Sequence, residues 1–214
     1  MPSLLRQRRD HERRQATRER LLQAAATVFA DKGYHRTLVS DIVTEAGVGQ
    51  GTFYRCFDTK RAVFGTLQEQ LFDELLGQFS DMQAHPPTDV AGYRRSSLAA
   101  IRRLVAVLEA RRDVASLMLR EAPSIDREAE QALTRMLDGF AEVARYYLDR
   151  AIEQGFARPC NSAVVAQSII GIAMRHLRRW TDGAYAGADL DELVGEVVDF
   201  AFLGFAPRTD GDGA

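Results

Sequence analysis

The segment from residue 50 to 57, Gln-Gly-Thr-Phe-Tyr-Arg-Cys-Phe, combines hydrogen-bonding and aromatic side chains in a pattern that suits recognition of another molecule. Phe53 and Phe57 are four residues apart, so on a helix they share one face and can pack against neighbouring helices. The polar side chains that remain to face outward are Gln50, Thr52, Tyr54 and Arg55. Glutamine can form two hydrogen bonds to adenine, and hydroxyl and guanidinium groups commonly bind phosphate. The segment therefore predicts contact with nucleic acid.

Two short helices joined by a glycine-containing turn are expected to position these side chains. In the first helix, apolar residues recur every four positions: Leu38, Ile42 and Ala46. Thr37 can cap this helix, and the sequence Gly47-Val48-Gly49 permits a sharp turn before the second helix. In a helix-turn-helix of this kind the second helix fits the major groove, which is about 12 Å wide. Lys60 would add a positive charge to the same phosphate-binding edge.

The distribution of charge agrees with a nucleic-acid-binding N-terminal part. Residues 1–61 carry twelve Lys and Arg against seven Asp and Glu, a net charge of +5 that leaves −7 for the rest of a chain whose total is −2. Clustered cations attract phosphates, whereas the acidic remainder is repelled by them. Five arginines lie close to the N-terminus: Arg6, Arg8, Arg9, Arg13 and Arg14. This basic arm either enters an adjacent minor groove or stays solvated.

The rest of the chain predicts an all-α fold with about nine helices, because every long segment has helical apolar spacing and none alternates with a period of two. One helix ends at Gly33, and a long one opens near Thr59 and stops before Pro86. Later helices are expected at residues 89–111, 112–122, 125–154, 162–181 and 189–205.

The segment from Gly33 to Lys60 resembles the DNA-binding domain of the TetR family of repressors. The matching elements are Gly33-Tyr34, Thr37, Asp41-Ile42, Ala46-Gly47-Val48, Gly51-Thr52-Phe53-Tyr54, Phe57 and Lys60. The sequence departs from the family pattern at Val43, at Gly49, where the family usually has a capping serine, and at Cys56.

The resemblance implies a homodimer that binds a palindromic operator on double-stranded DNA and is released by a small-molecule effector. With the residue chemistry above, the predicted DNA contacts are Thr37, Gln50, Gly51, Thr52, Tyr54, Arg55 and Lys60. Four parts are expected: a basic flexible arm (1–15), a helix-turn-helix DNA-binding domain (16–60), a ligand-binding and dimerisation domain (61–206) and a disordered tail (207–214).

The resemblance also places the dimer interface in the last two helices and a ligand pocket between the middle helices. Interface candidates are Val165, Ile169, Ile172, Leu190, Val194, Val197 and Ala201. Ligand candidates are Met118, Phe140, Tyr147, Met174 and His176. Periodicity alone leaves a second interpretation open for both sets, in which these side chains fill the core of one subunit.

Several other classes of function lack support in the sequence. The four histidines are scattered, no catalytic motif or phosphate-cradling glycine loop is present, and the only cysteines, Cys56 and Cys160, are not spaced as metal ligands. We expect no enzyme activity, cofactor or metal, and a cytoplasmic location without a membrane span. Two alternatives remain: a DNA-binding activator or architectural protein without an effector, and an interaction module whose basic part binds anionic membranes.

Overall fold

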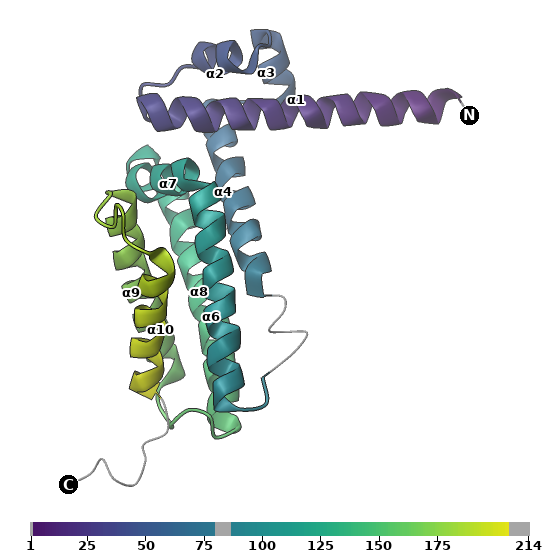
Figure 1. The fold of residues 1–214 in the computed structure, drawn as a ribbon. Coiled ribbons are helices and arrows are strands. Elements are labelled where there is room, and N and C mark those ends of the chain that lie inside the picture. The colour runs from purple at the N-terminus through teal and green to yellow at the C-terminus, as the bar shows by residue number, and fades with distance from the viewer. Residues whose placement is uncertain (1, 80–86, 206–214) are drawn as a thin grey trace, which may run out of the picture. The chain divides into compact units, whose positions relative to one another are not determined.

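The computed structural model describes residues 2–79 and 87–205. Within these ranges the regular elements are nine α-helices and one 3-10 turn, so the predicted all-α fold is confirmed (Figure 1). The elements are α1 (Pro2–Lys32), α2 (Val39–Ala46), α3 (Gln50–Cys56), α4 (Lys60–Leu76), η1 (Gly77–Phe79), α6 (Val90–Ala110), α7 (Arg112–Ile125), α8 (Arg127–Glu153), α9 (Ser162–Thr181) and α10 (Leu190–Phe205). None of these helices is long and apolar enough to cross a membrane.

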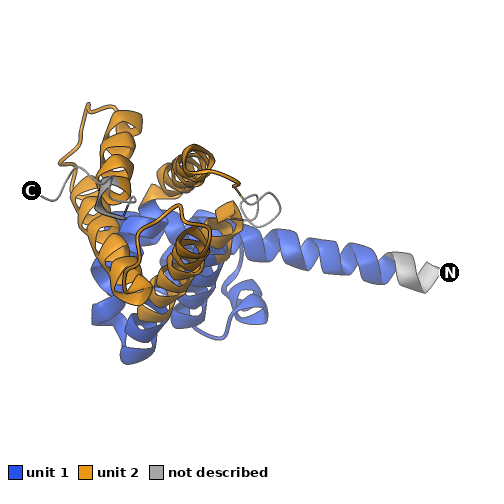
Figure 2. Cartoon of the chain, turned by 90° about the horizontal axis from the view of Figure 1, so that it is seen from below, with its two compact units in different colours: residues 1–72, 113–133 blue, residues 73–112, 134–214 orange. Residues whose placement is uncertain are grey.

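The chain forms two compact units that do not follow its order (Figure 2). Unit 1 comprises residues 1–72 and 113–133, and unit 2 comprises residues 73–112 and 134–214. Almost all of α7 therefore belongs with α1, α2, α3 and most of α4, although residues 73–112 between α4 and α7 belong to unit 2. The division by function into 16–60 and 61–206 stays a prediction, and the tail at 207–214 lies outside the described residues.

The core of unit 1 is built on the second half of α1. Leu21, Leu22 and Phe29 are fully buried there, and burial of each such side chain contributes about 1.5–3 kcal/mol. Phe29, Tyr34 and Phe64 form an aromatic cluster with ring centroids 5.4–6.5 Å apart. These contacts join α1 to α4 and to the turn before α2, which fixes the base on which the two short helices rest.

The N-terminal arm is helical rather than flexible, which differs from the sequence-based expectation. α1 begins at Pro2 and continues without interruption to Lys32. Residues 6–16 contain no glycine, proline or β-branched residue, and most of them favour helix. Opposite charges at i,i+4 spacing, such as Asp10 and Arg14, add to this preference. The strong charge suggested a solvated arm, but it does not prevent helix formation.

Unit 2 has its own apolar core: Tyr93, Ala100, Tyr147, Leu148, Ala151 and Ala157. Two ion pairs join α6 to α10, with Arg94 Nε donating to Asp199 Oδ1 at 2.7 Å and Arg102 Nη2 donating to Asp191 Oδ2 at 2.7 Å. Three residues predicted for the dimer interface pack, partly buried, against this core: Val165, Ile169 and Ala201. Their place in a dimer interface stays a prediction.

Candidate nucleic-acid interface

The turn between α2 and α3 has the geometry of a helix-turn-helix. Gly47 ends α2 with φ +62°, the left-handed conformation that glycine adopts without strain, and Val48 N–H donates to Val43 O at 3.0 Å. Gly49 is extended, with φ −78° and ψ 153°, and α3 starts at the next residue. The chain thus makes a sharp turn within three residues, as the sequence predicted.

α3 presents one buried and one exposed face. Phe53 has no exposed surface and Phe57 only 5%, and their ring centroids are 6.1 Å apart. The guanidinium of Arg18 on α1 lies 4.9 Å from the centroid of the Phe57 ring. These contacts fix the rotation of α3 about its axis. Four predicted contact residues are exposed on this helix: Gln50, Gly51, Tyr54 and Arg55.

Thr52 and Arg55 are linked on the exposed part of α3. Arg55 Nη2 donates a hydrogen bond to Thr52 Oγ1 at 2.9 Å, and Thr52 is partly buried. Tyr54 is 53% exposed, and its ring meets the Phe53 ring edge-on at 5.3 Å. A phenol, an amide and a guanidinium therefore lie on one short, well-anchored helix, an arrangement suited to contacts with base edges and phosphates.

α2 is held at both ends by charged side chains. Asp41 Oδ2 accepts a hydrogen bond from Leu38 N–H at 2.8 Å, and Lys32 Nζ donates to Asp41 Oδ1 at 2.9 Å. The Leu38 amide, followed by Lys32, holds the pKa of the Asp41 carboxyl below its usual range. At the other end Arg20 Nη2 donates to Ala46 O at 2.6 Å, which satisfies a carbonyl at the helix C-terminus.

Two predicted DNA contacts, Thr37 and Lys60, have internal roles in the structure. The Thr37 side chain has no exposed surface, and its hydroxyl donates to Gly33 O at 2.8 Å. It neither caps α2 nor can reach DNA, because the tight turn after α1 places it inside. Lys60 Nζ donates to Tyr34 O at 2.6 Å and to Thr37 O at 2.7 Å, and lies 4.2 Å from the centroid of the Tyr34 ring.

The environment of Lys60 agrees with a structural role. Partial burial lowers the pKa of its ammonium group, while Glu121 acts in the opposite direction. Two of its three donors are used by carbonyls of the 34–37 turn, which ties the start of α4 to the base of the helix-turn-helix. Sequence alone showed a cation next to a DNA-binding motif and could not show these partners.

The end of α7 also holds this turn, through residues that the sequence analysis missed. Glu121 Oε2 accepts from Tyr34 N–H at 2.6 Å, and the His35 ring contacts Ser124 Oγ at 3.2 Å. Arg61 Nε donates to Asp126 Oδ2 at 2.7 Å, and this bond is the main cause that lowers the pKa of Asp126. We name these three contacts the α7 latch. Acids near a helix end are common, so no signal in the sequence distinguished them.

The predicted ligand residues are divided between the two units. Met118 is 2% exposed in the core of unit 1. In unit 2, Tyr147 Oη donates to Phe79 O at 3.4 Å, and the Phe79 and Phe140 rings are 6.4 Å apart. Met174 is partly buried on α9.

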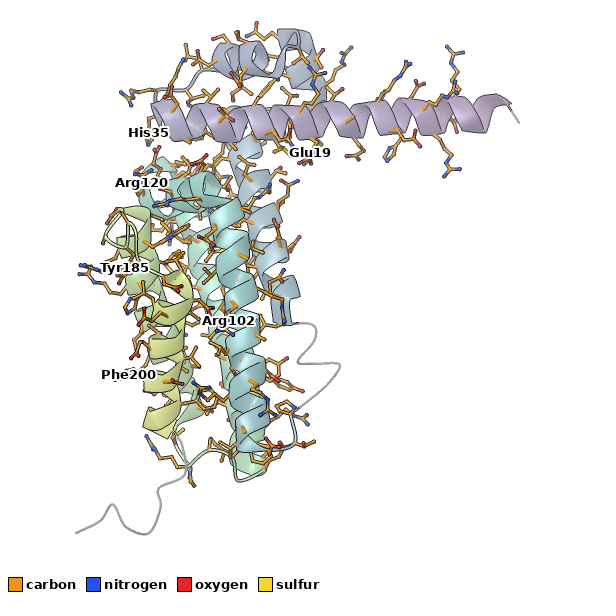
Figure 3. All side chains as sticks on the ribbon, in the orientation of Figure 1. Glu19, His35, Arg102, Arg120, Tyr185 and Phe200 are labelled. Carbon is orange, nitrogen blue, oxygen red and sulfur yellow. The ribbon has the colours of Figure 1, made fainter. Side chains whose placement is uncertain are left out.

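His176 is paired with Tyr185, which lies between α9 and α10 (Figure 3). His176 Nδ1 is 2.7 Å from the Tyr185 hydroxyl, and the two rings are stacked. No group of three or more His, Cys, Asp or Glu residues is arranged to hold a metal ion among the residues that the structure describes.

Comparison with known proteins identifies the N-terminal part. The family model described as bacterial regulatory proteins, tetR family, matches residues 21–67, which include α2, α3 and the start of α4. The uncharacterized HTH-type transcriptional regulator YvdT of Bacillus subtilis is 43% identical over 60 residues, 28% of this chain and 31% of that protein.

Other similarities extend over almost the whole chain. The fatty acid metabolism regulator protein of Bacillus subtilis is 26% identical over 187 residues, 86% of this chain and 93% of that protein. The fatty acid degradation regulator FadR of Bacillus halodurans is 25% identical with a TM-score of 0.75, covering 90% and 97% of the two chains. FadR of Bacillus subtilis, solved in complex with stearoyl-CoA, has a TM-score of 0.73 at 21% identity, covering 87% and 98%. The chain belongs to the TetR family of DNA-binding transcriptional regulators.

Proposed function

We propose that the protein is a homodimeric transcriptional repressor that binds a palindromic operator and is released from it by a fatty acyl-CoA or a related acyl compound. The observation that carries the DNA-binding part is the exposed set on α3, Gln50, Tyr54 and Arg55, above the buried Phe53 and Phe57. The acyl effector is suggested by relatives that extend over the whole chain and are named for fatty acid metabolism or degradation. A protein that binds DNA in this way would act in the cytoplasm.

The first experiment tests DNA binding by α3. Fluorescence anisotropy would compare the DNA upstream of the protein's own gene with unrelated DNA over a salt series. We expect binding about 10³-fold tighter to the first DNA, lost in Tyr54→Ala. Tyr146→Ala is a matched control, because Tyr146 is 51% exposed but lies in unit 2. Equal, steeply salt-dependent binding to both DNAs would contradict sequence-specific recognition at this site.

A dimer is proposed because two half-sites about 34 Å apart require paired recognition helices. Four predicted interface residues are partly exposed on α9 and α10: Ile172, Leu190, Val194 and Val197. Val164 on α9 is 60% exposed, and Phe200 on α10, labelled in Figure 3, is 68% exposed. Phe200→Glu should lower the mass measured by light scattering from dimer to monomer, whereas Val90→Glu, at a site 40% exposed on α6, should not. A dimeric Phe200→Glu would place the interface elsewhere.

Release by an effector requires a conformation that the effector prefers and the operator does not. We propose that this change passes through α4 and the α7 latch, since Glu121 and Asp126 contact the helix-turn-helix base directly. The coupling is the ratio of operator dissociation constants with and without effector. Glu121→Ala should lower this ratio, whereas Glu69→Ala, which removes an exposed acid of α4, should leave it unchanged. An unchanged ratio of dissociation constants in Glu121→Ala would show that the α7 latch does not transmit the effector response.

The effector class is tested on the same complex. Stearoyl-CoA should release the operator, whereas CoA without an acyl chain should not, because the proposed pocket binds the apolar chain. If stearoyl-CoA and a broad panel of acyl compounds and other metabolites all leave the operator affinity unchanged at fixed salt, the protein is a DNA-binding regulator without a small-molecule effector. An activator or architectural role would then be the better description.

A further inference from the structure

Residues 6–16 of α1 form a charged helical segment without a buried side chain. The 31 residues of α1 span about 46 Å at 1.5 Å per residue. From Arg6 on, where burial is described, every residue to Ala16 is exposed and the first buried side chain is Leu21. Figure 2 shows α1 running on beyond the other helices of unit 1. Between Arg6 and Ala16 lie five arginines and two acids, so this extension is strongly cationic.

Three of these arginines form a stripe along one side of the helix. Arg6, Arg9 and Arg13 follow each other at intervals of three and four residues, and Arg20 continues the series seven residues later. At about 100° per residue these four positions fall within roughly 60° of one another. We name them the α1 stripe. Arg8 and Arg14 lie well outside it, at least about 80° from its nearest member.

The stripe faces the side of α1 on which the helix-turn-helix rests. Its last member, Arg20, donates through Nη2 to Ala46 O at the end of α2. The same Nη2 lies 3.5 Å from where a Cβ would stand on Gly47, at the start of the turn that leads to α3. Arg6, Arg9 and Arg13 therefore extend, along the helix axis, the side of α1 that contacts the end of α2 and the turn before α3.

We propose that the α1 stripe binds the phosphates of DNA that flanks each half-site, with α1 lying as a helix against the backbone. This inference rests on the proposed function. An α-helix with its side chains is about 10 Å wide and the minor groove only about 6 Å, so a helical extension meets the backbone and does not enter the groove as an extended arm would. Residues 6–20 cover about 21 Å, the length of about six base pairs.

The chemistry of the stripe suits phosphate rather than bases. Arginine forms bidentate bonds to phosphate oxygens and keeps its charge at any working pH. Contacts of this kind add affinity and salt dependence without sequence preference. The extension would therefore lengthen the footprint of each subunit and strengthen binding to long DNA, while α3 determines which half-site is bound.

The test compares two double variants that remove the same charge from the same helix. Arg6→Gln/Arg13→Gln alters the stripe and Arg8→Gln/Arg14→Gln does not, and glutamine keeps helix propensity close to that of arginine. Binding is measured by anisotropy over a salt series on a duplex selected by the wild type from random 40-base-pair DNA. The same measurement uses a version trimmed to the two half-sites and an unselected 40-base-pair duplex.

On both long duplexes we expect the stripe variant to bind at least about tenfold more weakly near 0.1 M salt, with a salt slope lower by about three to four per dimer. The control double should lie close to wild type, and on the trimmed duplex the two variants should agree. Equal losses in the two variants, or a loss as large on the trimmed duplex, would overturn the inference.

Failure of the proposed function has a different signature. Wild-type protein would then bind selected and unselected duplexes equally, and Tyr54→Ala would have no effect on the preference between them. The stripe is still tested in that case, since phosphate contacts do not depend on sequence and the two doubles must differ on the unselected duplex. Circular dichroism of both doubles verifies that α1 remains helical.

Discussion

Lys60 offers a direct test of whether its ammonium group holds the helix-turn-helix or contacts DNA. Lys60→Met keeps the length of the side chain and removes the charge. The variant loses two hydrogen bonds, at 2.6 Å to Tyr34 O and 2.7 Å to Thr37 O, and a position 4.2 Å from the centroid of the Tyr34 ring. The two carbonyls of the 34–37 turn then have one partner fewer.

The cost can be worked from these contacts. Each hydrogen bond from a charged donor contributes about 1.5–3 kcal/mol and the contact with the ring about 0.5–1 kcal/mol. Part of this gain is offset, because desolvation of the ammonium group opposes its charged form and lowers its pKa. We therefore expect Lys60→Met to reduce the free energy of unfolding by about 2–3 kcal/mol.

Lys32→Met is the matched control. Lys32 forms an ion pair with Asp41 at 2.9 Å, but its side chain is 46% exposed. Exposed pairs contribute about 0–1 kcal/mol, so this variant should unfold close to wild type. Guanidinium denaturation followed by circular dichroism and tryptophan fluorescence gives the values, provided that both probes report the same transition.

The two roles of Lys60 predict different patterns. Suppose that Lys60→Met has the same free energy of unfolding as Lys32→Met but binds operator much more weakly, with a lower salt slope. The structural role of Lys60 would then be wrong, and its ammonium group would contact phosphate, as the sequence indicated. A loss of stability larger than that of the control supports the structural role.

Three further predictions follow from single positions. Gly49→Ser should stabilise the protein by a few tenths of a kcal/mol, because Gly49 is extended and a Cβ there meets nothing within 4 Å. Gly47→Ser should instead destabilise it by about 1–2 kcal/mol, because Gly47 has φ +62°. Thermal unfolding of the two variants tests both expectations. Asp126→Asn should lower the free energy of unfolding less and less as pH falls. Arg61 lowers the pKa of Asp126 in the folded protein, so the stabilisation from this carboxylate is present above the usual pKa of 3.8 and is lost as pH falls through the folded-state pKa. A difference in stability from wild type that persists at pH 2 would contradict this. Ala100→Leu should cost about 1–3 kcal/mol by overpacking unit 2, because Ala100 has no exposed surface; a variant as stable as wild type in denaturant would show spare room there.

Local patterns in the sequence predicted most of the fold and the exposed side chains of α3. Helical periodicity gave the helices, because each buries one apolar stripe, and Phe53 and Phe57 correctly fixed which face of α3 is buried. The expected flexible arm at residues 1–15 differs from the structure, in which α1 is helical from Pro2, because charge was weighed above helix propensity. Val165 and Ala201 pack, partly buried, against the core of unit 2. An apolar stripe alone does not show whether its partner belongs to the same subunit or to a second one, so their part in a dimer stays a prediction.

The internal contacts of Thr37 and Lys60 have a common cause that also bears on function. Thr37 lies in the turn after α1, whose polar backbone groups need partners, and Lys60 of α4 donates to two of its carbonyls while Glu121 of α7 accepts from its Tyr34 N–H. Both partner helices are far from the turn in the sequence. With these two side chains used internally, we expect contact with bases to be made by α3, a helix of only seven residues whose orientation depends on the base beneath it. Substitutions on the exposed face of α3 should then alter operator affinity alone. Substitutions at the base, such as Glu121→Ala, should alter stability, affinity and effector response together, because one set of contacts supports all three.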